Sequence, residues 1–198
     1  MATLVAMSGK GLDKSGSAST TDVATWVADG YKNIFRNTLS STFAQDYDNC
    51  LAGGLQVALF QGYYTPAYTD ETGAQRAQQA IDAVNLVGYP AGAYIFVDIE
   101  ETGTATEQYM IDWINSWCKA VQAAGYGAGV YFGANQPVSA YAAYYDTVSN
   151  RYWKSCSTSS ITPDVQGCCV IQTECTSSVD YDTFGADSLG DYCMGARA

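Results

Sequence analysis

The stretch Tyr94-Ile95-Phe96-Val97-Asp98-Ile99-Glu100 has the pattern of a buried strand that ends in two acids. Side chains alternate across a strand, so its aromatic residues and both acids share one face, and its three aliphatic residues share the other. The aliphatic face suits packing against helices, which leaves the aromatic and acidic face for the interior of a barrel. The segment therefore predicts a barrel strand whose C-terminal end carries Asp98 and Glu100.

The rest of the 198 residues alternates short apolar runs with longer helical patterns, which favours an α/β fold over an all-β fold. Eight strands is the number in a closed (β/α) barrel. We predict one domain over residues 1–198, a single TIM-like barrel with reduced or missing helices in its C-terminal third. The expected strands are 11–13, 33–36, 55–60, 93–99, 129–132, 152–153, 169–172 and 179–181.

Helical patterns separate the first five of these strands. The clearest helical pattern covers residues 106–124, where apolar residues recur at three- and four-residue spacing. They include Trp113 and Trp117, which we assign to core packing rather than to a binding surface. The pattern weakens after residue 133, and the Ser/Thr-rich run 155–162 is expected to be a loop. Helices are expected over 21–28, with Thr20 or Thr21 as N-cap, and over 42–52, 70–87, 106–124 and, more weakly, 137–148.

The charge balance limits the possible partners. Twenty acidic and nine basic residues give a formal net charge of -11. The average field of such a chain repels phosphate backbones and anionic membranes, so neither nucleic acid nor a membrane is an expected partner. The N-terminus has neither the basic flank nor the apolar segment of a signal peptide, and no apolar run is long enough to span a bilayer. The oligomeric state does not follow from the sequence.

Histidine is absent from the chain, and this absence narrows the possible chemistry. Ser-His-Asp and Cys-His catalytic systems are excluded, and so are zinc sites built on imidazole. Acid-base catalysis near neutral pH would therefore depend on carboxyl groups.

The seven cysteines indicate an oxidising environment. Five of them lie near the C-terminus, where disulfides could hold together a part of the chain with few helices. The prediction is an extracellular or otherwise oxidising location. A zinc site of four thiolates is disfavoured, because no Cys-x2-Cys pair stands opposite another. The clustered residues are Cys156, Cys168, Cys169, Cys175 and Cys193.

Inward-facing acids recur on the first and last predicted strands. Asp13 closes the first strand, and Asp180 and Asp182 share one face of the last. The first and last strands of a closed barrel are neighbours, and active sites of parallel barrels form at the C-terminal ends of the strands. We therefore expect Asp13 and Asp180 to approach Asp98 and Glu100 across the mouth of the barrel.

With these segments the sequence resembles the barrel glycosidases of glycoside hydrolase family 25, which include the Chalaropsis-type lysozymes. It resembles still more a related glycoside-hydrolase-like family of largely unknown function. The matching segments span most of the chain, and their ordered set is more specific than any one of them. They are Gly11-Leu12-Asp13-Lys14-Ser15, Phe35-Arg36, 52–57, Val97-Asp98-Ile99-Glu100, 129–133, Tyr152-Trp153 and 179–184.

The resemblance implies a retaining, lysozyme-like glycosidase that needs neither cofactor nor metal and acts on a polysaccharide. Glu100 would be the general acid, and Asp98 would assist the 2-acetamido group of the sugar as it attacks the anomeric carbon. Asp13 and Asp180 would position the substrate and tune the pKa of the acid. Two carboxyl groups in different environments are what glycoside cleavage requires. The candidate substrate-binding residues are Asp182, Tyr63, Tyr131 and Trp153.

Two alternatives remain open. The third predicted strand ends Phe60-Gln61-Gly62-Tyr63-Tyr64 where the lysozymes often carry a His-Phe pair, and Val170-Ile171-Gln172-Thr173 lacks the Trp that is expected before Gln172. These differences fit an inactive barrel that acts as a glycan-binding, structural or effector protein. The other alternative is a metal-dependent deacetylase or phosphodiesterase with Asp13, Asp98 and Glu100 as oxygen ligands.

Overall fold

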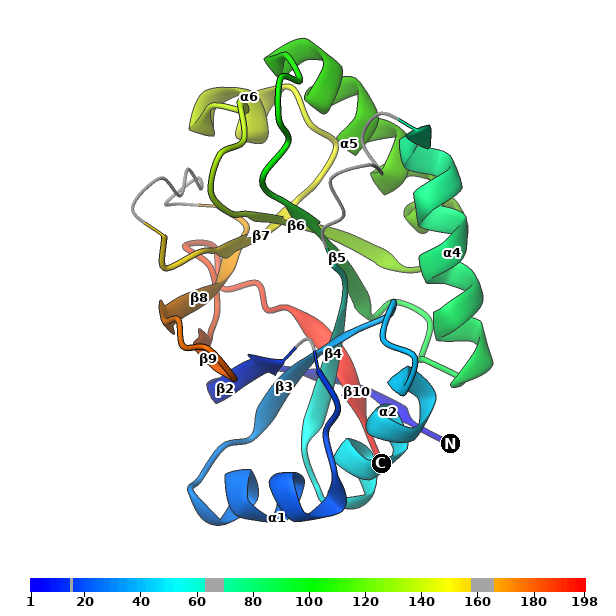
Figure 1. Ribbon diagram of the computed structural model, residues 1–198, viewed down its shortest axis with the longest axis vertical. Coiled ribbons are helices and arrows are strands. Elements are labelled where there is room, and N and C mark those ends of the chain that lie inside the picture. The colour runs from blue at the N-terminus through cyan, green and yellow to red at the C-terminus, as the bar shows by residue number, and fades with distance from the viewer. Residues whose placement is uncertain (15, 63–69, 158–165) are drawn as a thin grey trace.

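The computed structural model describes residues 1–14, 16–62, 70–157 and 166–198 of the chain. Eight strands close into a barrel, because β4 pairs with β5 as well as with β3 (Figure 1). Each strand overlaps one of the eight predicted segments, which confirms the TIM-like barrel. In chain order they are β2 (Gly9–Lys14), β3 (Asn33–Asn37), β4 (Gln56–Gln61), β5 (Tyr94–Ile99), β6 (Gly127–Phe132), β7 (Arg151–Lys154), β8 (Cys168–Glu174) and β9 (Asp180–Phe184).

The strand directions depart from an all-parallel barrel at one position. Strands β2 to β8 run parallel to one another, whereas β9 is antiparallel to both β8 and β2. A parallel connection needs a crossover of a dozen or more residues. Only residues 175–179 join β8 to β9, so the chain returns as a hairpin. As a result, the start of β9 lies at the barrel mouth, beside the ends of the parallel strands.

Two further strands lie outside the barrel and were not predicted from the sequence. The strand β1 (Thr3–Ala6) pairs antiparallel with β10 (Met194–Arg197), which in turn adjoins β4. Both strands have four residues, and β1 is mostly exposed, so neither shows a clear alternation of apolar and polar residues. Together they bring the two ends of the chain close to each other beside the barrel (Figure 1).

Five described helices cover part of the barrel (Figure 1). Each matches a predicted helix within three residues at either end. Only the N-cap of the first one differs, because Ser19 rather than Thr20 or Thr21 caps it, in a capping box with Asp22. The helices are α1 (Thr20–Ala28), α2 (Phe43–Ala52), α4 (Gly73–Leu86), α5 (Glu107–Ala123) and α6 (Ala140–Tyr145).

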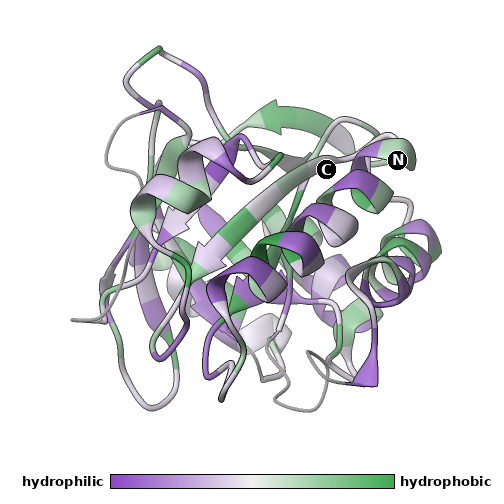
Figure 2. Ribbon diagram, turned by 90° about the horizontal axis from the view of Figure 1, so that it is seen from above, coloured by the Kyte–Doolittle hydropathy of each residue, from purple (hydrophilic) through white to green (hydrophobic). Residues whose placement is uncertain are grey.

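The outer core lies between these helices and the barrel wall. It contains the three aliphatic residues of β5 together with Trp113 and Trp117 of α5, as predicted. Gly73 allows α4 to lie close against α5, because a Cβ atom there would lie 2.1 Å from the backbone oxygen of Trp113. In Figure 2, purple and green alternate along the helices, as expected where one face of each is buried.

The inner core fills the barrel itself with aromatic side chains. The rings of Phe35 and Trp153 stack with their centroids 4.0 Å apart, and Phe96 meets Phe35 edge to face. Gly129 provides the space for Phe96, since a Cβ atom there would lie 2.4 Å from its ring. The aromatic face of β5 therefore points inward, as the alternation predicted.

The C-terminal third has few helices, which confirms the prediction. Within the described residues, α6 has only six residues and no helix follows it. Two of the five clustered cysteines, Cys156 and Cys175, form a disulfide that joins the segments after β7 and β8. The expected loop 155–162 is described only as far as Ser157.

A buried ion pair anchors the segment that follows β2. Nη2 of Arg36 on β3 lies 2.6 Å from Oδ2 of Asp46 on α2, and the side chain of Arg36 is fully buried. The same guanidinium donates to the backbone oxygens of Lys14 and Gly16 at 2.5 Å. Asp46 also accepts hydrogen bonds from the Ala18 backbone N–H and the Thr42 hydroxyl. This ion pair therefore fixes the chain where it leaves the barrel mouth.

Candidate active site

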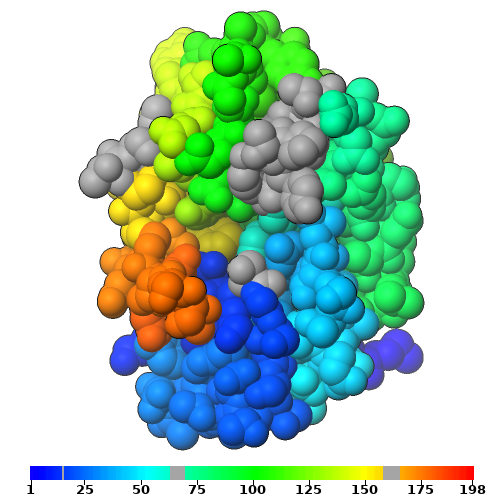
Figure 3. Space-filling view, viewed as in Figure 1, coloured from blue at the N-terminus to red at the C-terminus, as the bar shows by residue number. Residues whose placement is uncertain are grey.

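The barrel mouth contains a cavity of about 170 Å³. Figure 3 views the molecule from this side, and its surface is hollowed near the centre, beside the orange segment that follows β8. All four acids predicted to be catalytic line this one cavity, together with two of the predicted aromatic residues. The lining residues are Asp13, Phe60, Asp98, Glu100, Tyr131, Trp153, Gln172 and Asp180.

The end of β5 presents two of the acids. Asp98 lies within the strand, and Glu100 is the first residue after the end of the strand. Gly133 gives Glu100 its space, because a Cβ atom at that position would lie 2.2 Å from its Oε2 atom. The backbone N–H of Glu101 donates to the Ala134 carbonyl oxygen at 2.8 Å, and the N–H of Gly133 donates to the Ile99 carbonyl oxygen at 2.9 Å. The segment that contains Glu100 is thus held against the backbone that follows β6.

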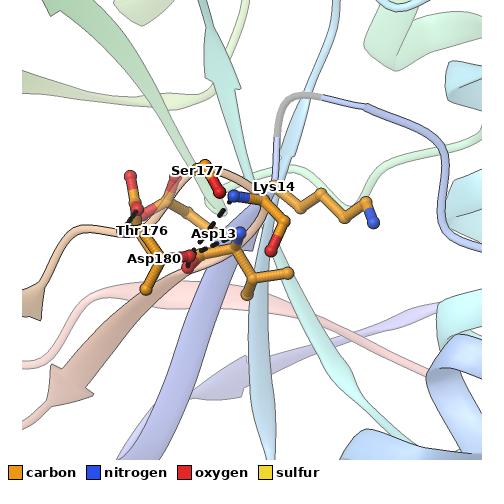
Figure 4. Close-up of a pocket in the computed structure, with 7 residues that line it drawn as sticks. Asp13, Lys14, Thr176, Ser177 and Asp180 are labelled. Atoms are coloured by element: carbon orange, nitrogen blue, oxygen red, sulfur yellow. Dashed lines mark hydrogen bonds between the residues drawn. The ribbon is translucent and has the colours of Figure 1, made fainter.

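Strands β2 and β9 supply the other acids. Asp13 and Asp180 are direct partners in the antiparallel ladder, which explains why both reach the mouth. The backbone N–H of Thr176 donates to Oδ1 of Asp180 at 2.6 Å (Figure 4). Asp182 lies one step deeper, is 3% exposed and accepts a hydrogen bond of 2.9 Å from Nε1 of Trp153. Asp182 therefore lies beneath the other acids rather than on the cavity wall.

Burial dominates the electrostatics of Asp13 and Asp182. Burial first and the charge of Asp180 second raise the pKa of Asp13 to about 7, against the hydrogen bond from Gln172. Burial and the charge of Asp13 raise the pKa of Asp182 well above its ordinary value. Because burial penalises the charged form, both carboxyl groups keep their protons to higher pH than an exposed aspartate does.

The pKa values of Glu100 and Asp180 are also raised. Burial, followed by the charge of the adjacent Glu101, raises the pKa of Glu100, and the nearby backbone of Ala134 opposes this shift. Burial also raises the pKa of Asp180. None of the residues that line the cavity is a cation. Lys14 lines the adjoining small pocket, but its side chain extends away (Figure 4), and its Nζ atom lies 5.6 Å from the ring centroid of Trp26.

The predicted substrate-binding aromatic residues differ in their exposure. Tyr131 is 9% exposed, and its hydroxyl donates to Oε1 of Gln172 at 3.1 Å. Trp153 is only 2% exposed, and one face of its ring is stacked on Phe35. Both side chains line the cavity and form part of its floor. Tyr63 lies outside the described residues.

Gln172 belongs to the site, although the sequence analysis did not select it. It is 4% exposed, and its Nε2 atom lies 2.9 Å from Oδ2 of Asp13 and 3.3 Å from Oδ2 of Asp180. A signal was present in the sequence. Gln172 shares the inward face of β8 with Val170, and a polar residue on a buried strand face needs partners.

The structure also bears on two other kinds of function. Across the described ranges, no group of three or more His, Cys, Asp or Glu side chains is arranged to hold a metal ion. In the same ranges, no helix has the length and apolar character needed to cross a membrane. The barrel mouth is lined by crowded carboxyl groups, and the pKa values of Asp13, Glu100 and Asp180 are raised.

The profile of the Rv2525c-like, glycoside hydrolase-like domain family matches residues 24–173, and the chain belongs to this family. No curated protein sequence matches the chain. Among solved structures, an uncharacterized protein from B. stearothermophilus is similar with a TM-score of 0.66 and 17% identity, over 88% of this chain and 95% of that one.

Two further structures share the fold. The Tat-secreted protein Rv2525c of Mycobacterium tuberculosis, solved in complex with HEPES, has a TM-score of 0.65 and 13% identity over 94% of this chain and 98% of its own. The modular autolysin LytC of Streptococcus pneumoniae, in complex with a synthetic peptidoglycan ligand, has a TM-score of 0.59 and 12% identity, over 89% of this chain and 46% of its own.

Proposed function

We propose that this member of the Rv2525c-like, glycoside hydrolase-like family is a retaining glycosidase that cleaves an amino-sugar glycan, such as peptidoglycan or a chitin-like polymer. The observation that carries the proposal is the convergence of Asp13, Asp98, Glu100 and Asp180 on one cavity at the barrel mouth. The fold that the chain shares with LytC, whose complex contains a peptidoglycan ligand, supports this class of substrate.

Glu100 is the general acid in this proposal. A general acid must hold a proton near neutral pH and release it in the transition state. Burial and the neighbouring charge of Glu101 raise the pKa of Glu100, which favours the protonated form. Glu100 transfers this proton to the glycosidic oxygen as the bond from that oxygen to the anomeric carbon breaks.

Asp98 acts on the substrate's own nucleophile. The carbonyl oxygen of the 2-acetamido group attacks the anomeric carbon, and the Asp98 carboxylate accepts the acetamido N–H and stabilises the positive charge that develops. Water then attacks the anomeric carbon from the side that the leaving group vacated. Its proton passes to Glu100, the bond to the acetamido oxygen breaks, and the anomeric configuration is retained. Such substrate-assisted hydrolysis needs no enzyme nucleophile.

The remaining acids hold the sugar and set the local field. Asp13 and Asp180 face the cavity, where they accept hydrogen bonds from sugar hydroxyl groups. Asp182 lies below them and orients Trp153 through its hydrogen bond to the indole N–H. Because Tyr131 and Trp153 form the floor, they contact the sugar through their edges.

A second candidate function is glycan binding without hydrolysis, as a binding, structural or effector protein. The observation that favours it is the low exposure of Trp153, 2%, and of Tyr131, 9%, which leaves little ring surface on which a sugar could stack. For either function we propose an extracellular location. The disulfide between Cys156 and Cys175 fits an oxidising compartment, and the similar protein from M. tuberculosis is Tat-secreted.

The test compares the wild type with Glu100→Gln on peptidoglycan and on N-acetylglucosamine oligomers. We expect Glu100→Gln to lower kcat by roughly 10²- to 10⁴-fold, because the amide has no acidic proton to donate. Glu174→Gln is the matched control, since Glu174 is an exposed glutamate at the end of β8. NMR of the first product should show the retained anomer.

The possible outcomes separate the two functions. Turnover that survives in Glu100→Gln would contradict the assignment of the general acid. An inverted product would contradict the role of the acetamido group. A wild type that binds the oligomers without cleaving them would favour the second candidate.

A further inference from the structure

Gln172 connects several parts of the barrel mouth through a single side-chain amide. Its Nε2 atom donates to Asp13 on β2 and to Asp180 on β9, at 2.9 and 3.3 Å. Its Oε1 atom accepts from the Tyr131 hydroxyl on β6 at 3.1 Å and from the Cys156 backbone N–H after β7 at 3.2 Å. Both ends of the amide are therefore hydrogen-bonded, and Gln172 is 4% exposed.

The donors around the oxygen fix the orientation of the amide. A flipped amide would turn its NH₂ group toward the Cys156 N–H and the Tyr131 hydroxyl and its oxygen toward two carboxylates, where acceptor would face acceptor. The observed orientation gives each carboxylate one of the two N–H bonds. Gln172 therefore acts on Asp13 and Asp180 as a donor alone.

The disulfide between Cys156 and Cys175 supports this arrangement from outside the barrel. Cys156 supplies a backbone N–H to Gln172, and Thr176, next to Cys175, supplies a backbone N–H to Asp180. The covalent bond thus joins the two segments whose backbone donors hold Gln172 and Asp180. Figure 4 shows Thr176 and Asp180 side by side, next to Asp13.

We propose that Gln172 is a positioning residue of the active site, which fixes the carboxylates of Asp13 and Asp180 in the geometry that receives the sugar hydroxyl groups. This inference rests on the proposed glycosidase function and extends it to a residue that does not itself touch the reacting atoms. The hydrogen bond from the amide also favours the ionised form of Asp13 and so opposes the effect of burial on its pKa.

Several titratable groups surround this amide. They are Asp13 on β2, Asp180 and Asp182 on β9, Tyr131 on β6, and Asp98 and Glu100 at the end of β5. The hydrogen bond from Gln172 lowers the pKa of Asp13, whose raised value of about 7 is set mainly by burial. Removal of the donor should therefore raise the pKa of Asp13 further.

The experiment uses two variants of the full chain. Gln172→Glu can still accept hydrogen bonds from Tyr131 and Cys156 but can no longer donate two bonds to the acids, whereas Gln172→Met loses both sets. The matched control is Gln61→Met. Gln61 is also a buried glutamine at a strand end and is 1% exposed. Its side chain faces the outer core, where its Nε2 atom donates to the Arg76 backbone oxygen and its Oε1 atom accepts from the Trp117 indole N–H.

Two measurements are made on each variant. Carboxyl ¹³C NMR titration reports the pKa of Asp13 without any need for turnover, and kcat/KM is measured against pH on an N-acetylglucosamine oligomer. For both Gln172 variants we expect the pKa of Asp13 to rise by roughly one unit. We expect kcat/KM to fall by roughly 10- to 100-fold and its acidic limb to move to higher pH, because Asp13 keeps its proton longer. Gln61→Met should change stability alone.

The outcomes distinguish this inference from the function on which it rests. If the wild type cleaves the oligomer and the Gln172 variants change neither the titration nor the pH profile, Gln172 is a structural residue and the inference is wrong. If the wild type cleaves nothing, the proposed function fails. In that case an unchanged Asp13 titration in the uncharged variant Gln172→Met would overturn the inference separately, and a raised pKa in that variant would support the positioning role in a binding site.

Discussion

Two buried polar groups of this protein, one around Asp46 and one around Asp182, differ in what compensates the charge of their carboxylates. Asp46, 2% exposed, bonds to the Arg36 guanidinium, a backbone N–H and a hydroxyl. Asp182, 3% exposed, has the Trp153 N–H and a second acid, Asp13, as neighbours. The first group contains a cation, whereas none of the described residues that line the cavity above the second is a cation.

The difference indicates separate roles for the two groups. A buried pair of opposite charges with all its hydrogen bonds made can fix the position of two elements, here β3 and α2. A group of closely spaced carboxylates lowers the stability of the folded state unless some of the carboxyl groups stay protonated. Strongly shifted carboxyl groups in a cavity are typical of functional sites. The ion pair holds the scaffold, whereas the acid cluster contains the carboxyl groups with raised pKa values on which the proposed hydrolysis depends.

The largest expected effect comes from breaking the compensated group. Arg36→Met leaves Asp46 buried without its cation, and we expect a loss of about 3–5 kcal/mol in the free energy of unfolding, measured by urea denaturation. The double variant Arg36→Met/Asp46→Asn removes both charges and should lose less than the single variant. A double variant as unstable as Arg36→Met alone would mean that the hydrogen bonds to the backbone, rather than the charge, dominate this group.

The next effect concerns the pH dependence of the uncompensated group. The pKa of Asp13 is about 7 in the folded protein, against 3.8 for an unperturbed aspartate. Because the folded state binds this proton more tightly, the stabilisation is complete below about pH 4 and is lost as the pH rises through 7. Relative to the wild type, Asp13→Asn should therefore gain on the order of 3 kcal/mol between pH 4 and pH 8.

Urea denaturation of both proteins at each pH measures this difference. The comparison cancels the carboxyl groups that shift the other way, such as Asp22 and Asp187, whose pKa values are lowered. A constant difference between Asp13→Asn and the wild type over this range would show that Asp13 titrates normally.

The smallest effect on stability, but a clear one on activity, is expected at Gly133. An added Cβ atom would lie 2.2 Å from Oε2 of Glu100 and 2.7 Å from its Cβ atom, so the carboxyl group must move away and the backbone beside it must shift slightly. We expect Gly133→Ala to lower kcat by roughly 100-fold, as for a catalytic group displaced by about 1 Å, with about 1 kcal/mol lost in stability.

Gly185→Ala is the control for this change, since nothing lies within 4 Å of a Cβ atom there. Its activity and stability should match those of the wild type. If Gly133→Ala retained full activity on N-acetylglucosamine oligomers, the observed position of Glu100 would not be the catalytic one.

Much of the fold could be predicted because it is encoded locally. The two-residue alternation of β5 oriented Phe96, Asp98 and Glu100, and the three- and four-residue spacing of α5 oriented Trp113 and Trp117. The strands β1 and β10 could not be predicted, because four residues are too few to show such a pattern and β1 is mostly exposed. The disulfide partner of Cys156 could not be predicted either, since any of the clustered cysteines was possible.

The sequence by itself determined which side chains face the barrel and which acids stand near strand ends, because side-chain direction along a strand depends only on the alternation of its residues. Tertiary structure decided how these acids meet. The antiparallel return of β9 sets Asp180 beside Asp13 and Asp182 beneath them, and β8 brings the amide of Gln172 against two carboxylates. These contacts join residues as far apart as 13 and 180, and their charges shift one another only when the closed barrel removes them from water.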